Sequence, residues 1–421
     1  MRNGRFNKAL QSIRAAPPVV WILLGFLFSY LCFFLRSVFF SGPRMDILQM
    51  VVPAMTPIGA DLRQTLISVR RLFLGEGTPY VGNIPYPPLV YVLLGPMLLF
   101  GSGSGYIVFT LTTLVAFAWQ TLILAHRIAG GRQLTTSLLL VFVSGMMSYG
   151  LLFELERAQF NVIAALLAYL AIWIFHSDKK RVWLAYALLS ISVHLKLYPL
   201  VFVLMLIDDW RDWKGNFRRL LLLGAANLAL AFVLGPWIFL DFVNALRART
   251  SFPQTIRFDN HSAYSFGRLV TEAVAARGLP GPAQAASVLE YLLPAAVGMC
   301  VLLLMLKAYR QRIRGLSASL LLACALAAIL IPPVSHDYTL TILAAPVAIF
   351  LSKLEQQHAD GWRSMPLTAA ILVFAAAYSS TLFPLGYKPG VLVLQSNFPV
   401  LFTMLVTTTL IAWWWPPNRN A

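Results

Sequence analysis

The residues best suited to chemistry lie in one segment near the start of the chain. The segment opens with D-L-R-Q-T-L-I-S-V-R-R, in which Asp61 is followed by three arginines, and it runs on to Tyr86-Pro87-Pro88. It comes directly after the first apolar run that is long enough to cross a membrane. A carboxylate beside cations, just outside a bilayer, suits the transfer of a group from a phospholipid carrier.

Asp61 also has a simpler interpretation and a competitor. An aspartate at a helix start accepts hydrogen bonds from free backbone N–H groups, so Asp61 can be read as a helix cap. The helix is predicted to be amphipathic, with arginines on its polar face and Leu62 and Leu66 able to enter lipid. Asp46 lies in the same loop and is either the alternative carboxylate or a solvated loop acid. Tyr86-Pro87-Pro88 fits a helix start, where proline is tolerated.

A second group of polar residues interrupts two apolar runs in F-E-L-E-R-A-Q-F-N. Glu154, Glu156 and Arg157 sit at a predicted tight turn, where charges commonly just face water. The other interpretation is that they line a polar cavity together with Gln159 and Asn161, which begin the next helix.

Lys196 is the strongest candidate for binding an anion. It lies between His194 and Tyr198 at a predicted helix break, because Pro199 disfavours a continuous helix. Its side chain either extends to the membrane interface or binds a phosphate group.

A third polar group lies further along the chain, in R-F-D-N-H-S-A-Y-S-F-G-R. It contains Asn260, His261 and Ser262, with Arg257 and Arg268 on either side. Arginines in an outer loop run against the usual retention of basic residues in the cytoplasm. These two therefore hint at an anionic ligand.

Ser335, His336, Asp337 and Tyr338 follow two prolines at the outer end of a predicted span. A His-Asp pair suggests acid–base chemistry, although adjacent side chains point in different directions and a histidine at a membrane edge is commonly structural. None of the six histidines has metal-ligand spacing. No phosphate-binding glycine loop or nucleophile elbow occurs. We therefore expect no metal and no cofactor, and find no support for a nucleotide or acyl-enzyme mechanism.

The composition excludes a soluble globular protein. Of the 421 residues, 59% are hydrophobic and 12% are charged, the mean hydropathy is +0.72, and apolar runs of spanning length recur from end to end. The chain is predicted to be an all-α polytopic membrane protein. Its net charge of +17 is explained by basic cytoplasmic loops near anionic lipid rather than by nucleic acid. Cys32, Cys300 and Cys324 lie in apolar runs, so we expect buried thiols.

The basic connections set the predicted orientation. The N-terminal segment carries four basic residues and no acid, which places it in the cytoplasm. Keeping the other basic loops inside gives about 12 spans with both termini cytoplasmic. Residues 183–207 are predicted to form two short helices with Lys196 at the outer turn, and residues 87–100 an outer helix that dips into the membrane. The other predicted spans are 17–40, 106–125, 134–152, 160–175, 220–240, 291–306, 318–334, 339–352, 367–382 and 400–415.

This topology gathers the polar candidates on one side of the membrane. Residues 41–105, 241–290 and 383–398 face outward, and we expect one integral membrane domain over residues 1–421. It comprises a core module at 1–240 that carries the first outer loop, a second outer loop at 241–290, and C-terminal helices at 291–421. The large first outer loop argues against a transporter built on inverted repeats.

Taken together, these residues resemble glycosyltransferase family 87, the polyprenol-phosphate-mannose-dependent mannosyltransferases of the GT-C superfamily. The order of the motifs covers most of the chain. Thr65 stands where an aromatic residue is common, and His261 replaces a glutamine. The late histidine motif is matched only in part. The matching positions are Asp61, Gly75, Pro79-Tyr80, Tyr86-Pro87-Pro88, Gln159, Asn161, Lys196 to Pro199, Asn260 to Ser262, and Ser335 to Tyr338.

The resemblance implies a GT-C fold and an inverting transfer of a sugar, mannose in the first place, from a polyprenyl phosphate to a hydroxyl of a glycolipid or glycan. The reaction would occur at the outer face of the cytoplasmic (inner) membrane. Asp61, or else Asp46, would be the general base. Lys196 would stabilise the leaving phosphate, and His336 would position a substrate. The helping cations would be Arg157, Arg257 and Arg268. The pocket would include Tyr86, Gln159, Asn161, Tyr198, Asn260, His261, Asp337 and Tyr338.

Two other functions fit part of the pattern. A transporter or flippase of lipid-linked sugars would need cations and a lipid-accessible cavity, but no outer carboxylate, so Asp61→Asn would leave it active. A polysaccharide ligase or an acyltransferase would depend on His336 or on a pair of outer arginines. The residues themselves fit another hexose or a pentose as well as mannose.

Overall fold

The structure is a computed structural model that describes residues 17–40, 58–80, 85–131, 133–251, 260–278, 280–356, 365–383 and 396–414. These residues form helices joined by short turns, and the only extended pairings among them are isolated bridges at Asp209–Arg314 and Asn260–His336. The α-helices are α2 (Pro18–Phe40), α4 (Ala60–Phe73), α5 (Pro88–Leu93), α6 (Ser102–Ala118), α7 (Ala125–Ala129), α8 (Thr136–Met146), α9 (Tyr149–Arg157), α10 (Asn161–Ser177), α11 (Val182–Leu195), α12 (Trp213–Ala231), α13 (Pro236–Ser251), α14 (Ala263–Ala275), α15 (Pro280–Ser287), α16 (Leu289–Gln311), α17 (Ala318–Leu330), α18 (Ala344–Gln356), α19 (Met365–Ser380) and α21 (Phe398–Trp414). The remaining helical segments are the 3-10 helices η1 (Gly95–Leu99), η3 (Lys179–Arg181), η4 (Tyr198–Leu206) and η6 (Asp337–Leu343), and the π-helical turn η2 (Trp119–Leu124).

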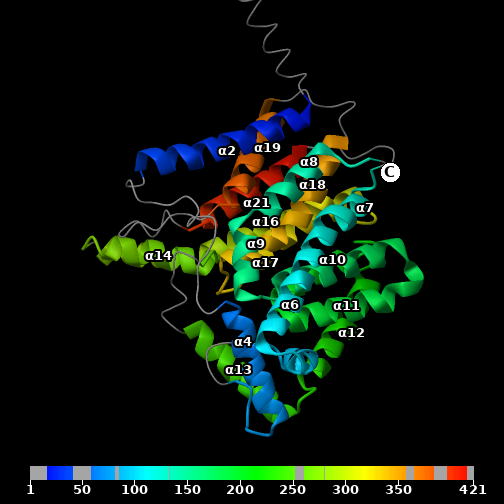
Figure 1. Ribbon diagram of the computed structural model, residues 1–421. Coiled ribbons are helices and arrows are strands. Elements are labelled where there is room, and N and C mark those ends of the chain that lie inside the picture. The colour runs from blue at the N-terminus through cyan, green and yellow to red at the C-terminus, as the bar shows by residue number, and fades with distance from the viewer. Residues whose placement is uncertain are drawn as a thin grey trace, which may run out of the picture.

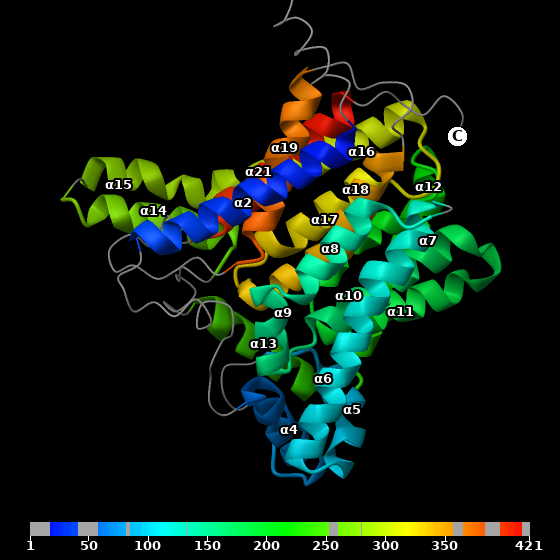
Figure 2. The same ribbon diagram turned by 45° about the horizontal axis from the view of Figure 1, so that its top comes forward.

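The core lies around α17 and α18, which run through the middle of the molecule (Figures 1 and 2). Every residue of α17 except Ser319 is buried, and so is almost all of α18. A helix that is apolar all round must be covered on every face. The neighbours that cover these two helices are α8, α16, α21 and η4.

Several described helices are fit to cross a membrane. Helical stretches Gly103–Ala129, Gly281–Gln311 and Asp337–Gln356 are long and apolar enough, and two bent pairs, α8 with α9 and α12 with α13, pass the same test together. Their outward faces carry large apolar side chains; Val115 on α6, for example, is 68% exposed. Such faces are stable in lipid and costly in water. The predicted class, an all-α membrane protein, is confirmed, while the number of about 12 spans stays a prediction.

Two of the predicted spans do not run as straight helices. The span predicted at 220–240 is not one continuous helix, because α12 ends at Ala231 and the chain bends by 100° into α13. Gly235 permits this bend with a φ of +91°, and Pro236 begins the new helix. The span predicted at 134–152 is interrupted by a bend of 46°, where the Ser148 side chain caps α9.

The predicted break near Lys196 is confirmed. Helix α11 ends at Leu195, Lys196 has an extended backbone with φ −149° and ψ 142°, and η4 begins at Tyr198. The break fits the restriction that a proline places on the preceding turn. The predicted amphipathic helix after Asp61 is α4, and the predicted helix start at Pro88 begins α5.

Helices α4, α5 and α13 lie together at one end of the molecule, the lower end in Figure 2. A small apolar cluster attaches α4 there, in which Leu62 and Val69 pack with Tyr91 and Phe160. The Gly59 N–H also donates to the Glu156 carbonyl at 2.7 Å, which ties the first turn of α4 to α9. These contacts fix Asp61 close to the turn between α9 and α10.

The opposite end is formed by α2 and α19, which run side by side (Figure 1). They approach closely at Gly25, where a Cβ atom would stand 2.6 Å from the Ala375 Cβ. All three cysteines are free thiols. Cys324 is buried as expected, but the expectation is wrong for Cys32, which is exposed on the outward face of α2.

Candidate active site

Nine of the polar residues singled out in the sequence surround one cavity of about 290 Å³. Its walls come from the start of α4, the segment before α5, the α9–α10 turn, the break between α11 and η4, α13, and the segment that leads into η6. The polar and aromatic lining residues include Asp61, Tyr86, Gln159, Asn161, Lys196, Tyr198, Arg249, Ser335, His336 and Tyr338.

The Asp61 carboxylate faces this cavity and does not cap α4. The N-cap residue is Gly59, with a φ of +71° and no side-chain cap hydrogen bond. Arg157 Nη1 lies 3.3 Å from Asp61 Oδ1, and Gln159 Nε2 donates to Asp61 Oδ2. The Asp61 side chain is 19% exposed, so it remains accessible. The helix-cap interpretation is therefore wrong.

Gln159 links the carboxylate to the lysine. Its Oε1 accepts a hydrogen bond from Lys196 Nζ at 2.7 Å and one from the Tyr86 hydroxyl at 3.1 Å. Because the amide group donates at one end and accepts at the other, a single side chain orients Asp61 and Lys196 together. The cavity consequently holds an anionic end and a cationic end.

The Lys196 ammonium lies among aromatic rings. Nζ is 4.8 Å from the centre of the Tyr86 ring and 5.8 Å from that of Tyr338, and it donates to the Tyr86 hydroxyl at 3.3 Å. Lys196 stands in the turn between α11 and η4, outside the helices long enough to span a membrane. Burial lowers its pKa to about 8, against the opposing effect of the Glu154 and Asp61 carboxylates. A poorly hydrated ammonium of this kind is well suited to bind an anion.

Glu154 is hydrogen-bonded to the first residues of α10. Its side chain is fully buried, and its carboxylate accepts hydrogen bonds from Asn161 Nδ2 at 2.8 Å and from the Val162 N–H at 3.1 Å. It thus caps α10 and does not simply face water. The Tyr198 hydroxyl donates to the Asn161 carbonyl at 2.7 Å. Gln159 and Asn161 line the cavity as the second interpretation of this turn has it, whereas Glu154, Glu156 and Arg157 are not among its lining residues.

Two motifs that are distant in the sequence, Asn260–Ser262 and Ser335–Tyr338, pack against each other next to the cavity. The His261 N–H donates to the Ser335 carbonyl at 2.7 Å, and Asn260 Oδ1 accepts from the Ser335 N–H at 2.9 Å. His261 Nε2 lies 2.8 Å from Asp337 Oδ1. His336 and Tyr338 line the cavity, whereas Asn260, His261 and Asp337 are not among its lining residues. The Asp337 carboxylate therefore contacts His261.

The other charged residues predicted for the site, apart from Arg157, are Asp46, Arg257 and Arg268. Asp46 and Arg257 lie outside the described residues. Arg268 is placed beside Glu290, with Nε 3.8 Å from Oε1, and it does not line the cavity. Arg249 of α13 does line it, although the sequence argument did not single it out. The signal was present, because Arg249 lies in a predicted outer loop where arginines are uncommon.

No group of three or more His, Cys, Asp or Glu side chains within the described ranges is arranged to hold a metal ion. The expectation that the reaction needs no metal stays a prediction.

The fold and the cavity define an integral membrane protein with an enzyme-like site of one carboxylate and several cations. Comparison with protein families matches glycosyltransferase family 87 over residues 84–333, more than half of the chain. The chain belongs to this family, and it is a glycosyltransferase. Tyr86, Gln159 and Lys196 lie within the matched range, while Asp61 precedes it. No curated protein and no solved structure matches the chain.

Proposed function

We propose that the protein is an inverting glycosyltransferase of the GT-C type. It moves a sugar, with mannose as the first candidate, from a polyprenyl phosphate to an acceptor hydroxyl. The acceptor is a lipid or a glycan at the outer face of the cytoplasmic membrane, and both termini lie in the cytoplasm. The observation that carries the proposal is the chain of contacts from Asp61 through Gln159 to Lys196. It provides a base and a phosphate-binding cation in one cavity.

In the proposed reaction the acceptor hydroxyl lies against the Asp61 carboxylate. Asp61 takes its proton as the acceptor oxygen forms a bond to the anomeric carbon. The bond from that carbon to the phosphate oxygen breaks, and its electron pair leaves with the lipid phosphate. Because attack and departure occur on opposite faces of the carbon, one displacement inverts the anomeric configuration.

The cations of the cavity stabilise the departing phosphate. Lys196 is the principal group, and Arg249 is the nearest additional candidate because it lines the same cavity. Arg157 contacts Asp61 and lies 5.5 Å from the Phe153 ring centre, so its role is to orient the carboxylate. His336 lines the same cavity, and its proposed role is to position the sugar or the acceptor.

The direct test is a transfer assay with purified protein in proteoliposomes. Polyprenyl-phosphate-mannose carrying a radioactive sugar is the donor, and an extract of membrane lipids supplies the acceptor. We expect label in a new glycolipid with the anomeric configuration opposite to that of the donor. Movement of intact donor between leaflets, without a new covalent product, would contradict the proposal and identify a transporter.

The pH dependence of donor use is a second expected result. Since the pKa of Lys196 is lowered to about 8, the free enzyme holds the ammonium form below that pH and loses it above. We expect kcat/KM for the donor to fall as the pH rises through about 8, because kcat/KM reports ionisation of the free enzyme. Initial rates at subsaturating donor concentrations between pH 6 and 10 measure this fall in kcat/KM.

The matched variant for the pH experiment is Lys196→Arg. A guanidinium stays protonated throughout this range, so the variant should lose the alkaline fall even if its rate is lower. A fall at the same pH in Lys196→Arg would assign the ionisation to a different group.

A further inference from the structure

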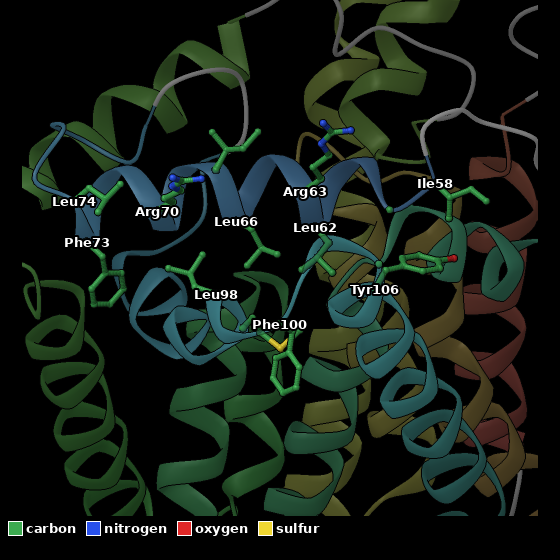
Figure 3. A pocket seen from close by; sticks show the side chains of 14 residues that line it. Ile58, Leu62, Arg63, Leu66, Arg70, Phe73, Leu74, Leu98, Phe100 and Tyr106 are labelled. Atoms are coloured by element: carbon green, nitrogen blue, oxygen red, sulfur yellow. The ribbon is translucent and has the colours of Figure 1, made fainter.

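A second and larger cavity, of about 770 Å³, lies along α4 (Figure 3), and Asp61 is not among the residues that line it. We call it the α4 groove, and its walls are α4, η1, and the start of α6. Its volume is within the usual range of ligand sites, roughly 300–1,000 Å³. The residues that line it are Ile58, Gly59, Leu62, Arg63, Leu66, Ile67, Arg70, Phe73, Leu74, Met97, Leu98, Phe100, Gly103 and Tyr106.

The floor of the α4 groove is apolar. Figure 3 shows Leu62 and Leu66 pointing from α4 toward the side where Leu98 and Phe100 lie. Phe73 and Phe100 are 57% and 45% exposed, so no side chain of the described residues closes this surface. A concave apolar surface of this kind is suited to an apolar chain.

The rim of the α4 groove is cationic. Arg63 and Arg70 are both exposed and are seven residues apart, which places them on one face of α4 about 10 Å apart along its axis. In Figure 3 the Arg63 side chain points away from the apolar floor. Neither arginine side chain has an ion pair or a hydrogen bond with any residue in the described part of the chain. Two available guanidinium groups above an apolar floor complement an anionic head group with a lipid chain.

The α4 groove and the candidate active site share the first turn of α4. Gly59 and Leu62 line the groove, whereas Asp61, which lies between them in the chain, lines the active-site cavity. Arg63 is two residues from Asp61, about 3 Å along the helix axis and about 200° around it, so the two side chains leave α4 on nearly opposite faces. A lipid whose head group is held at Arg63 therefore has to extend that head group over the first turn of α4 to reach the carboxylate end of the cavity.

The position of the lysine decides which substrate this lipid is. Gln159 stands between Asp61 and Lys196, so a donor phosphate bound by Lys196 lies at the other end of the cavity from the groove. The substrate that must meet Asp61 is the acceptor, because its hydroxyl loses the proton.

We propose that the α4 groove binds the lipid chain of the acceptor, an anionic lipid whose phosphate is held by Arg63 and Arg70. Its hydroxyl-bearing head group then reaches over the first turn of α4 to Asp61. The inference rests on the proposed function and adds the chemical class of the acceptor and the place where it binds.

The first arm of the test measures lipid binding and requires no catalysis. Purified protein in neutral detergent is titrated with phosphatidylglycerol or with phosphatidylcholine of the same acyl chains, and bound lipid is counted by native mass spectrometry. The wild type should prefer phosphatidylglycerol. The double variant Arg63→Gln/Arg70→Gln should lose about tenfold in affinity for it and keep its affinity for phosphatidylcholine.

Two further variants keep this arm interpretable. Leu98→Trp narrows the apolar floor and should weaken binding of both lipids. Arg310→Gln removes an exposed arginine from the last turn of α16, far along the chain from the groove, and should behave as the wild type. Equal binding of the two lipids, unchanged in the double variant, would overturn the proposal.

The second arm separates acceptor from donor. The lipid extract that accepts label is used intact and after its acyl chains have been removed by alkaline deacylation. The double variant and Leu98→Trp should each raise KM for the intact acceptor about tenfold, with KM for the donor unchanged. The deacylated acceptor keeps its phosphate but has lost its apolar chains, so Leu98→Trp should have little effect on it, whereas the double variant should still raise its KM. An increase confined to the donor KM would assign the groove to the donor and overturn the proposal. If the wild type transfers no sugar, the proposed function fails by itself, and the binding arm still decides whether the groove holds an anionic lipid.

Discussion

The variant Asp61→Asn should lose at least about 10³-fold in turnover while still binding the donor. Asparagine has nearly the same shape as aspartate, so it preserves the packing at the start of α4, but it cannot accept the acceptor's proton. General-base catalysis typically contributes about 10²- to 10⁴-fold to a rate. The measurement is the initial rate of label transfer in proteoliposomes, with donor retention measured on the same preparation.

Two matched variants show whether this loss is specific. Glu272→Gln removes an exposed carboxylate from α14, away from the cavity, and should keep wild-type turnover. Asp46→Asn tests the competing carboxylate in the first outer loop. Transfer activity lost only in Asp46→Asn would move the base to that residue, and full transfer activity in Asp61→Asn would exclude Asp61 as the base.

The second large effect is expected for Lys196→Met. Methionine keeps much of the length of the side chain but removes the cation that the lipid phosphate needs as it departs. Removing one stabilising donor from a preorganised site commonly costs about 10²- to 10³-fold in kcat. We expect a loss of this size in kcat/KM for the donor, measured with saturating acceptor.

The control for this experiment is Lys214→Met. Lys214 is an exposed lysine in the first turn of α12, and its replacement should leave kcat/KM unchanged. Lys196→Arg should recover part of the rate, because it restores the charge with a different shape. Wild-type kcat/KM in Lys196→Met would exclude Lys196 from phosphate stabilisation.

The amino-acid sequence by itself determined the class of the protein and much of its local structure. The apolar runs predicted a helical membrane protein, and the structure confirms this class. Pro199 predicted the break beside Lys196, Pro87-Pro88 predicted the start of α5, and the pattern after Asp61 predicted α4. The family resemblance was confirmed as well. These features depend on hydropathy, backbone restrictions and short motifs, which a sequence displays directly.

Only the tertiary structure decided what each charged side chain does. Asp61 had two interpretations until its contacts with Arg157 and Gln159, which are 96 and 98 residues away in the chain, excluded the helix cap. In the same way, Glu154 is a buried cap of α10, and Arg249 enters the cavity only because the chain bends by 100° before α13. Local patterns specify helices, but the partner of a polar side chain is set by packing between segments that are distant in sequence.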